Sequence, residues 1–181
     1  ASNPRAMEKA RALPADGVII DLEDSVAPDA KQSARAHMQA AVRSGGFGSR
    51  ELVVRVNGLE SGFGADDIRA AAAAGATTVL FPKIDGPAEL RAALGHLDAA
   101  GGRSLPVWVM IETPKSIQCV DQIAGVSPRV GALVMGTADL ARSLRLPAEA
   151  SRMGLLYSLG RCLVAARAGG VDILDGVFGD L

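Results

Sequence analysis

Several short apolar runs in this sequence end in charged residues whose types could bind a metal ion and an anionic substrate. The charged residues at or just after these ends are Glu23-Asp24, Arg55, Lys83, Glu112 and Asp139. Carboxylate oxygens with no histidine or cysteine close by favour a hard cation, and Mg²⁺ is usually held by one or two carboxylates while water and substrate complete its coordination. We therefore predict an Mg²⁺ site whose direct ligands are Glu112 and Asp139.

Three carboxylates crowd the end of the first apolar run, at Asp21, Glu23 and Asp24. Like charges at this spacing repel, and burying them without partners is costly. We predict that cations share their space and that Glu23 and Asp24 hold metal-bound water molecules. Three alternatives stay open: Asp24 could cap the following helix, Arg55 could be a structural ion-pair partner of Glu23, and Lys83 could be a solvated residue before a loop.

Strands and helices must alternate along the chain to position these residues. Strands are predicted at Gly17–Glu23, Glu51–Asn57, Thr77–Lys83, Pro106–Glu112, Val130–Gly136 and Val171–Phe178. Helical patterns lie between them, and turn residues mark their ends, such as Gly75 after one helix and Thr113-Pro114 at the start of another. Repeated strand–helix units without hairpin signals predict a parallel sheet.

The polar residues favour a particular parallel fold, because they fall at the carboxyl ends of nearly all the predicted strands. In a (β/α)8 barrel that end carries the active site, whereas an open doubly wound sheet concentrates its site at one switch point. We predict that residues 1–181 form a single, partial TIM-barrel domain whose first and last strands are missing. Alternation along a strand would put Arg55 and Asn57 on one face.

Composition limits the partners that the protein can have. The net charge is −1, which gives no reason to expect nucleic acid, and no apolar run is long enough to cross a membrane. Cys119 and Cys162 are far apart in apolar helical patterns, so we expect small core residues with free thiols and a cytoplasmic location. His37 and His96 have polar neighbours and are predicted at the surface, which leaves no histidine base.

A set of short motifs gives the chain a family resemblance. In order, they are Asp21-Leu22-Glu23-Asp24-Ser25-Val26, Lys31, Ala34-Arg35, Val54-Arg55-Val56-Asn57, Pro82-Lys83, Ile111-Glu112-Thr113 and Gly136-Thr137-Ala138-Asp139-Leu140. Their order and spacing resemble those of the citrate lyase beta-subunit-like family, the malyl-, citramalyl- and citryl-CoA lyases of the Mg²⁺-dependent aldolase/lyase barrel superfamily. The resemblance covers essentially the whole chain.

The resemblance implies a carbon–carbon lyase that splits a 3-hydroxyacyl-CoA into an acyl-CoA, such as acetyl-CoA, and a 2-oxo acid. It implies that Glu112 and Asp139 bind the metal, that Arg55 binds the carboxylate of the oxo acid, and that Glu23 and Asp24 lie around the metal's water molecules. The family also has a lysine near the site at the position of Lys83. We assign Gly136 and Thr137 to substrate binding, and we expect a homo-oligomer, a trimer or hexamer.

Two other functions remain open from the sequence. A class II pyruvate aldolase would share the metal site, but such enzymes typically have a histidine where this chain has Asp24. A non-catalytic subunit that binds a metal and an oxo acid is the other alternative. Family members continue through a C-terminal region that supplies an acid/base aspartate, so this chain is either the ordered part of a longer one or completed by a partner, and we expect the former.

Overall fold

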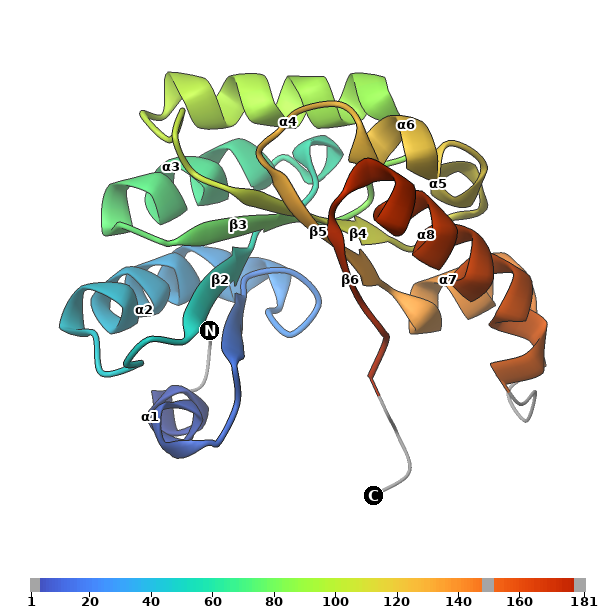
Figure 1. Ribbon diagram of the computed structural model, residues 1–181. Helices are drawn as coiled ribbons and strands as arrows, with labels where there is room; N and C mark the ends of the chain where they lie inside the picture. The colour runs from blue at the N-terminus through green and yellow to red at the C-terminus, as the bar shows by residue number, and fades with distance from the viewer. Residues whose placement is uncertain (1–3, 148–151, 178–181) are drawn as a thin grey trace. The chain divides into compact units, whose positions relative to one another are not determined.

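The computed structural model describes residues 4–147 and 152–177, in which helices and parallel strands alternate (Figure 1). The chain divides into two compact units. The first comprises Ala1–Leu80 and Ala93–Pro106, and the second comprises Phe81–Ala92 and Val107–Leu181. The expectation of one partial domain over residues 1–181 stays a prediction.

The first unit begins with a helix and then alternates strands with helices. Its elements are α1 (Pro4–Ala12), β1 (Gly17–Asp21), η1 (Pro28–Ala30), α2 (Lys31–Ser44), β2 (Glu51–Arg55), η2 (Leu59–Ser61) and α3 (Gly64–Ala74). The strand β3 (Thr78–Phe81) and the helix α4 (Pro87–Ala99) each have residues in both units.

The second unit continues the alternation with shorter helices. Its elements are β4 (Val107–Ile111), α5 (Pro114–Gln118), α6 (Val120–Ala124), β5 (Val130–Met135), α7 (Thr137–Ser143), η3 (Arg152–Leu155), α8 (Leu156–Gly169) and β6 (Asp172–Leu174). All six predicted strands are therefore present but shorter than predicted, and Phe178, in the last of them, lies outside the described residues.

The strands pair in parallel, as the repeated strand–helix pattern predicts. β1 pairs with β2 and β2 with β3, and in the second unit β4 pairs with β5 and β5 with β6. The strand order is the chain order, β1-β2-β3-β4-β5-β6. A doubly wound sheet reverses its order at a switch point, so this order favours the barrel topology over the doubly wound one. A closed barrel of eight strands stays a prediction.

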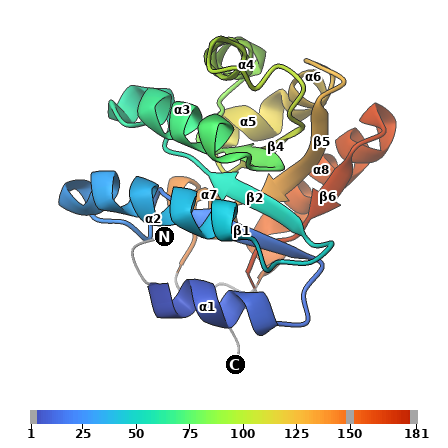
Figure 2. The ribbon, with the colours of Figure 1, turned by 90° about the vertical axis from the view of Figure 1, so that its left-hand side faces the viewer.

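Apolar residues at helical spacing bury one side of α2 and of α3 in the first unit. In α2 the buried stripe contains Ala34, Met38 and Ala41, and α2 packs beside α3. Figure 2 shows these two helices next to each other on the same side of β1 and β2. The helix α3 ends at Gly75, whose φ of 84° is the left-handed conformation that glycine adopts without steric cost.

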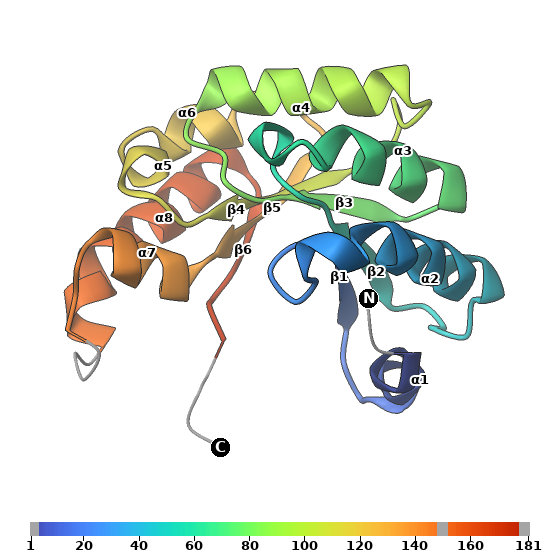
Figure 3. The same ribbon diagram turned by 180° about the vertical axis from the view of Figure 1, so that it is seen from behind.

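Helix ends in the second unit are fixed by side chains and glycine in the way that the sequence predicts. Thr113 caps α5, because its Oγ1 accepts a hydrogen bond from the Ser116 N–H while Ser116 Oγ accepts one from the Thr113 N–H. Gly170 ends α8 with a φ of 67°. The helix α8 packs against α5, α6 and β6, as Figure 3 shows from behind.

The remaining sequence predictions are confirmed for the two surface histidines and for Cys162 in the core, but Cys119 is only half-buried. His37 and His96 are exposed. Cys119 and Cys162 are free thiols, and burial raises the pKa of Cys162 to about 11. Within residues 4–147 and 152–177, no helix is long and apolar enough to cross a membrane.

Candidate functional site

In the first unit, Asp21 and Arg55 end two neighbouring strands and face each other. Asp21 is the register partner of Arg55 in the β1–β2 pair. The Nε of Arg55 donates to Asp21 Oδ1 at 2.7 Å, and its Nη2 donates to Oδ2 at 2.8 Å. This two-point geometry is the strongest that an arginine and a carboxylate form. The planar edge of Arg55 is therefore occupied by Asp21.

The other two carboxylates of the segment, Glu23 and Asp24, also lie close to Arg55. Arg55 Nη1 lies 3.0 Å from Glu23 Oε2 and 3.6 Å from Asp24 Oδ2. Glu23 is buried, whereas the side chain of Asp24 is 58% exposed. The three acids are thus compensated by a protein cation that lies between them, as the sequence predicts. Their proximity to metal-bound water stays a prediction.

The pair of Asp21 and Arg55 stays ionised over a wide pH range. Burial alone would raise the pKa of Asp21, but hydrogen bonds and the charge of Arg55 outweigh it and hold that pKa well below its usual range. Burial would lower the pKa of Arg55, but Asp21, Glu23 and Asp24 raise it further above its ordinary value. Both charges therefore contribute to stability at neutral pH.

Replacing Asp21 by Asn should lower the free energy of unfolding by about 2 kcal/mol at pH 7, because charged hydrogen bonds of this kind are lost. The depressed pKa means that this stability is present above pH ~4, the ordinary value, and is lost as the pH falls further. Denaturant unfolding should therefore show a smaller difference in the free energy of unfolding between wild type and Asp21→Asn at pH 3 than at pH 7. Asp175→Asn, in an exposed pair with Arg152, is the matched control and should change stability by less than about 0.5 kcal/mol.

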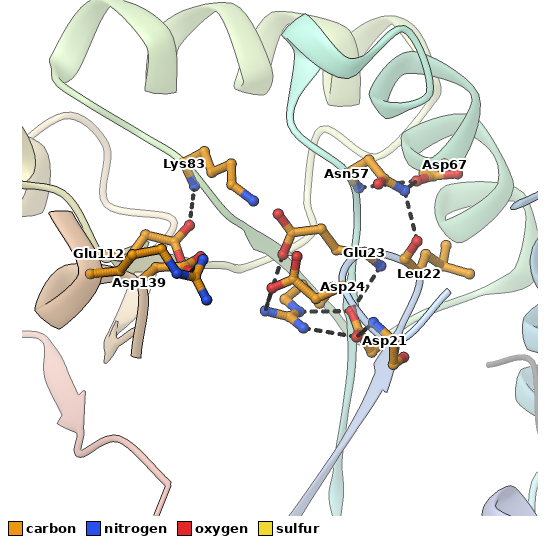
Figure 4. A network of polar contacts seen from close by, with 12 residues as sticks. Asp21, Leu22, Glu23, Asp24, Asn57, Asp67, Lys83, Glu112 and Asp139 are labelled. Carbon is orange, nitrogen blue, oxygen red and sulfur yellow. Dashed lines mark hydrogen bonds and ion pairs between the residues drawn. The ribbon is translucent and has the colours of Figure 1, made fainter. Parts of the chain in front are cut away.

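In the second unit, Glu112 follows β4 and is almost completely buried, with 2% of its surface exposed. Its Oε1 accepts a hydrogen bond from the backbone N–H of Lys83 at 2.7 Å, which Figure 4 draws as a dashed line. Lys83 reaches this position with a φ of 53°, in the left-handed region that non-glycine residues rarely adopt. Strained backbone of this kind is typical of functional sites.

Asp139 lies in the first turn of α7, and the start of that helix packs against Glu112. Gly136 precedes α7, and a Cβ there would lie 2.5 Å from Glu112 Cβ and 2.8 Å from its Oε2. Asp139 Oδ1 accepts a hydrogen bond from Arg142 at 2.7 Å. The described residues contain no group of three or more His, Cys, Asp or Glu side chains able to hold one metal ion. Two carboxylates from neighbouring segments fit a cation that keeps water and substrate as its other ligands.

Gly136→Ala should lower the free energy of unfolding by about 1–3 kcal/mol, because the new methyl group would overlap a buried side chain. The matched control is Gly160→Ala in α8, where a Cβ meets no atom within 4 Å. This control should be neutral or stabilise the helix by up to about 1 kcal/mol. Thermal or urea unfolding measures the stability of both variants. Equal free energies of unfolding would show that the structure can accommodate a methyl group at position 136.

The structure shows different contacts for Lys83, Gly136 and Thr137, the other residues predicted to belong to the site. Lys83 contacts Glu112 through its backbone N–H, so this hydrogen bond holds Glu112 in place without using the ammonium group. Gly136 serves the packing of Glu112, and the side chain of Thr137 lies against Gly176, where a Cβ would not fit. Substrate contact by Gly136 or Thr137 stays a prediction.

Asn57 does not share a face with Arg55, which corrects the expectation from strand alternation. The strand β2 ends at Arg55, so alternation no longer applies two residues later. The Asn57 side chain is buried and bonds to Lys31 Nζ and to Asp67. Lys31, although one of the motif residues, and Asp67 were not predicted to be site residues, yet both lie on the buried stripes of α2 and α3. A charged residue at such a position is the signal that would have found them.

The chain is similar in sequence to curated proteins that act on malyl-CoA thioesters, according to their names. The chain is 42% identical over 177 residues to a (3S)-malyl-CoA thioesterase of Cereibacter sphaeroides, across 98% of this chain and 60% of that protein. It is 37% identical over 151 residues to an L-malyl-CoA/beta-methylmalyl-CoA lyase of the same species, across 79% of this chain and 48% of that protein. The chain thus spans about three fifths or less of the length of these relatives.

Two solved structures from Mycobacterium tuberculosis share the fold. One is a citrate lyase beta subunit complexed with oxaloacetate and magnesium, with a TM-score of 0.81 and 28% identity over 99% of this chain and 76% of that chain. The other is the protein CitE in complex with magnesium, acetoacetate and coenzyme A, with a TM-score of 0.81 and 29% identity over 99% of this chain and 64% of that chain. A family model described as HpcH/HpaI aldolase/citrate lyase matches residues 1–181, and the chain therefore belongs to this family.

Proposed function

We propose that the protein containing this chain is an Mg²⁺-dependent carbon–carbon lyase. Its substrate would be a 3-hydroxyacyl-CoA of the malyl-, citramalyl- or citryl-CoA type, and its products an acyl-CoA such as acetyl-CoA and a 2-oxo acid. The observation that carries the proposal is the buried carboxylate of Glu112, held by the Lys83 amide and packed against the start of the helix that carries Asp139.

Glu112 and Asp139 would hold the Mg²⁺ ion. Oxygen-only donors suit this ion, and two relatives of known structure are described with magnesium. Bound there, the ion would stabilise negative charge that develops on an oxygen of the oxo-acid fragment. One oxygen of Glu112 already accepts a hydrogen bond from an amide, which fixes the direction in which the other faces.

Arg55 would recognise the carboxylate of the oxo acid. Its Nε and Nη2 are bound by Asp21, so the Nη1 side, which lies near Glu23 and Asp24, is the side from which it would contact a substrate. Asp21 thereby acts as the anchor that orients the guanidinium. That Arg55 and the pair Glu112 and Asp139 act on one substrate stays a prediction from the sequence.

The proposed cleavage breaks the bond between the hydroxyl-bearing carbon and the carbon next to the thioester. The hydroxyl group loses its proton and becomes the new carbonyl group, while the electron pair of the broken bond passes to the thioester as an enolate. The enolate then takes up a proton to give the acyl-CoA. The residues proposed here bind and orient the acid end of the substrate, which is the fragment that leaves as the 2-oxo acid.

Hydrolysis of the thioester is the second candidate, because the relative with 42% identity is named a (3S)-malyl-CoA thioesterase. In that reaction water attacks the thioester carbonyl, the carbon–sulfur bond breaks and the carbon skeleton stays whole. Both candidates need recognition of the same 3-hydroxyacyl-CoA. They therefore share the roles proposed for Arg55 and for the metal ligands and differ in the bond that breaks.

Product analysis with the full-length protein, Mg²⁺ and (3S)-malyl-CoA separates the two reactions. The lyase gives glyoxylate and acetyl-CoA in equal amounts, detected as the hydrazone of the aldehyde and by chromatography of the thioester. The hydrolase gives malate and free CoA, detected with a thiol reagent. If neither pair formed from malyl-, citramalyl- or citryl-CoA, the proposal would be wrong. The homo-oligomer and the cytoplasmic location stay predictions beside it.

A further inference from the structure

Lys31 is a buried lysine in the first turn of α2, with 7% of its surface exposed. Its Nζ donates to three acceptors: the backbone oxygen of Leu22 at 2.8 Å, that of Glu23 at 2.7 Å, and Asn57 Oδ1 at 2.8 Å. An ammonium group has three donors, so all of them are used. Burial of a lysine is costly without such partners, which means that this arrangement needs an explanation beyond packing.

Asn57 links Lys31 to the buried carboxylate of Asp67. Asn57 Nδ2 donates to the Leu22 oxygen at 2.8 Å and also to Asp67 Oδ2, which accepts the Asn57 backbone N–H at 3.0 Å as well (Figure 4). Asp67 is completely buried, and its Oδ1 accepts from Arg35 at 2.9 Å. The donors and acceptors therefore fix the orientation of the Asn57 amide.

The same contacts hold the peptide between Leu22 and Glu23 from both ends. Its carbonyl oxygen accepts from Lys31, and its N–H donates to Asp21 Oδ1 at 2.8 Å. Asp21 Oδ2 also accepts the N–H of Ser25 at 3.0 Å. A cation on the carbonyl and an anion on the amide leave this peptide one favourable orientation. The carbonyls of Leu22 and Glu23 point toward Lys31, while the carboxylate of Glu23 lies beside Arg55.

We propose that Lys31 is a positioning residue for the anion-binding function of Arg55. It acts through the Leu22–Glu23 peptide, which places Asp21 and Glu23 around the guanidinium. The inference rests on the proposed function, because it takes the carboxylate of a 2-oxo acid as the ligand of Arg55. All three donors of Lys31 are used within the protein, so its effect would reach Arg55 through the Leu22–Glu23 peptide and Asp21.

A stabilising role alone and a positioning role predict different results for Lys31→Met. Methionine keeps most of the volume but removes all three donors. If Lys31 positions Arg55, the dissociation constant for pyruvate in the presence of Mg²⁺ should rise tenfold or more, while the affinity for Mg²⁺ alone should change less than threefold. If Lys31 only stabilises the fold, the melting temperature should fall and both affinities should stay at their wild-type values.

Arg50→Met is the matched control. Arg50 is also a cation that caps backbone carbonyls in the first unit, those of Ala10, Arg11, Leu13 and Phe47. None of these four hydrogen bonds involves the segment Asp21–Asp24. Its loss should lower the melting temperature and leave pyruvate binding unchanged. Lys31→Gln, which keeps an N–H donor, should give an intermediate pyruvate affinity and serves as the test if Lys31→Met does not fold.

Calorimetric titration of the full-length protein with pyruvate, with and without Mg²⁺, decides the inference. Wild-type protein that shows no Mg²⁺-dependent binding of pyruvate, glyoxylate or oxaloacetate would contradict the proposed function before any variant is compared, and if it binds one of the other two, that acid replaces pyruvate in the comparison. Wild-type protein that binds pyruvate, together with Lys31 variants that bind it equally well, would overturn the positioning role alone. A selective loss of pyruvate affinity, absent in Arg50→Met, supports it.

Discussion

Glu112→Gln and Asp139→Asn should each abolish Mg²⁺ binding and lower turnover about 1,000-fold, while the protein stays folded. Each change replaces a charged oxygen ligand by an amide of the same shape. Loss of a group that only supports a metal ligand costs about 10–100-fold in affinity, so loss of a ligand should cost more. The fall in turnover corresponds to several kcal/mol of transition-state stabilisation, the amount that a Lewis acid supplies.

Calorimetry with Mg²⁺ alone and assays at saturating metal measure the two effects separately. The matched controls are Glu8→Gln and Asp172→Asn, whose side chains are 72% and 85% exposed. They should bind Mg²⁺ and turn over at wild-type rates. Near-normal activity in either Glu112→Gln or Asp139→Asn would remove that residue from the metal site.

Arg55→Lys should weaken binding of the oxo acid about 10–100-fold and leave CoA binding within about threefold. Lysine keeps the charge, but its single nitrogen cannot form the two parallel hydrogen bonds that Nε and Nη2 of Arg55 make to Asp21 while a third nitrogen faces the substrate. Loss of charged hydrogen bonds of this kind costs about 1.5–3 kcal/mol, which is the source of the range.

Comparison of KM for glyoxylate and for acetyl-CoA in the condensation direction tests this selectivity. Arg50→Lys is the control, because it makes the same substitution at an arginine that caps carbonyls of α1 and the following turn. An equal rise of both KM values in Arg55→Lys would count against a role in oxo-acid recognition and in favour of general distortion.

The order of elements could be predicted from the sequence because the signals are local. Apolar runs such as Val107–Ile111 are followed directly by a polar residue. Gly75 marks the end of one helix by its backbone conformation, and Thr113 marks the start of another by capping it. The family resemblance is confirmed by the match over the whole chain. Strand ends were predicted too long, because polar residues that follow a strand can look like its last positions, as with Asn57.

The hydrogen-bond partners of the site residues could not be predicted from the sequence, unlike the order of the strands and helices. The sequence suggested that a cation compensates Asp21, Glu23 and Asp24, but it could not show that Asp21 takes the bidentate edge of Arg55. That pairing follows from strand register, which is a long-range property. The left-handed conformation of Lys83 is equally invisible, because its amide bonds to a carboxylate 29 residues away.

The hydrogen bonds around Asn57 also bear on the chemical lifetime of the protein. Asn57 is followed by Gly58, and an asparagine before glycine tends to deamidate, because the unhindered glycine nitrogen attacks the side-chain amide carbon. The attack requires the amide to rotate, but this amide is buried and bonded at both its oxygen and its nitrogen. The rate of deamidation at Asn57 would therefore report how often the segment around Asn57 opens in the native protein.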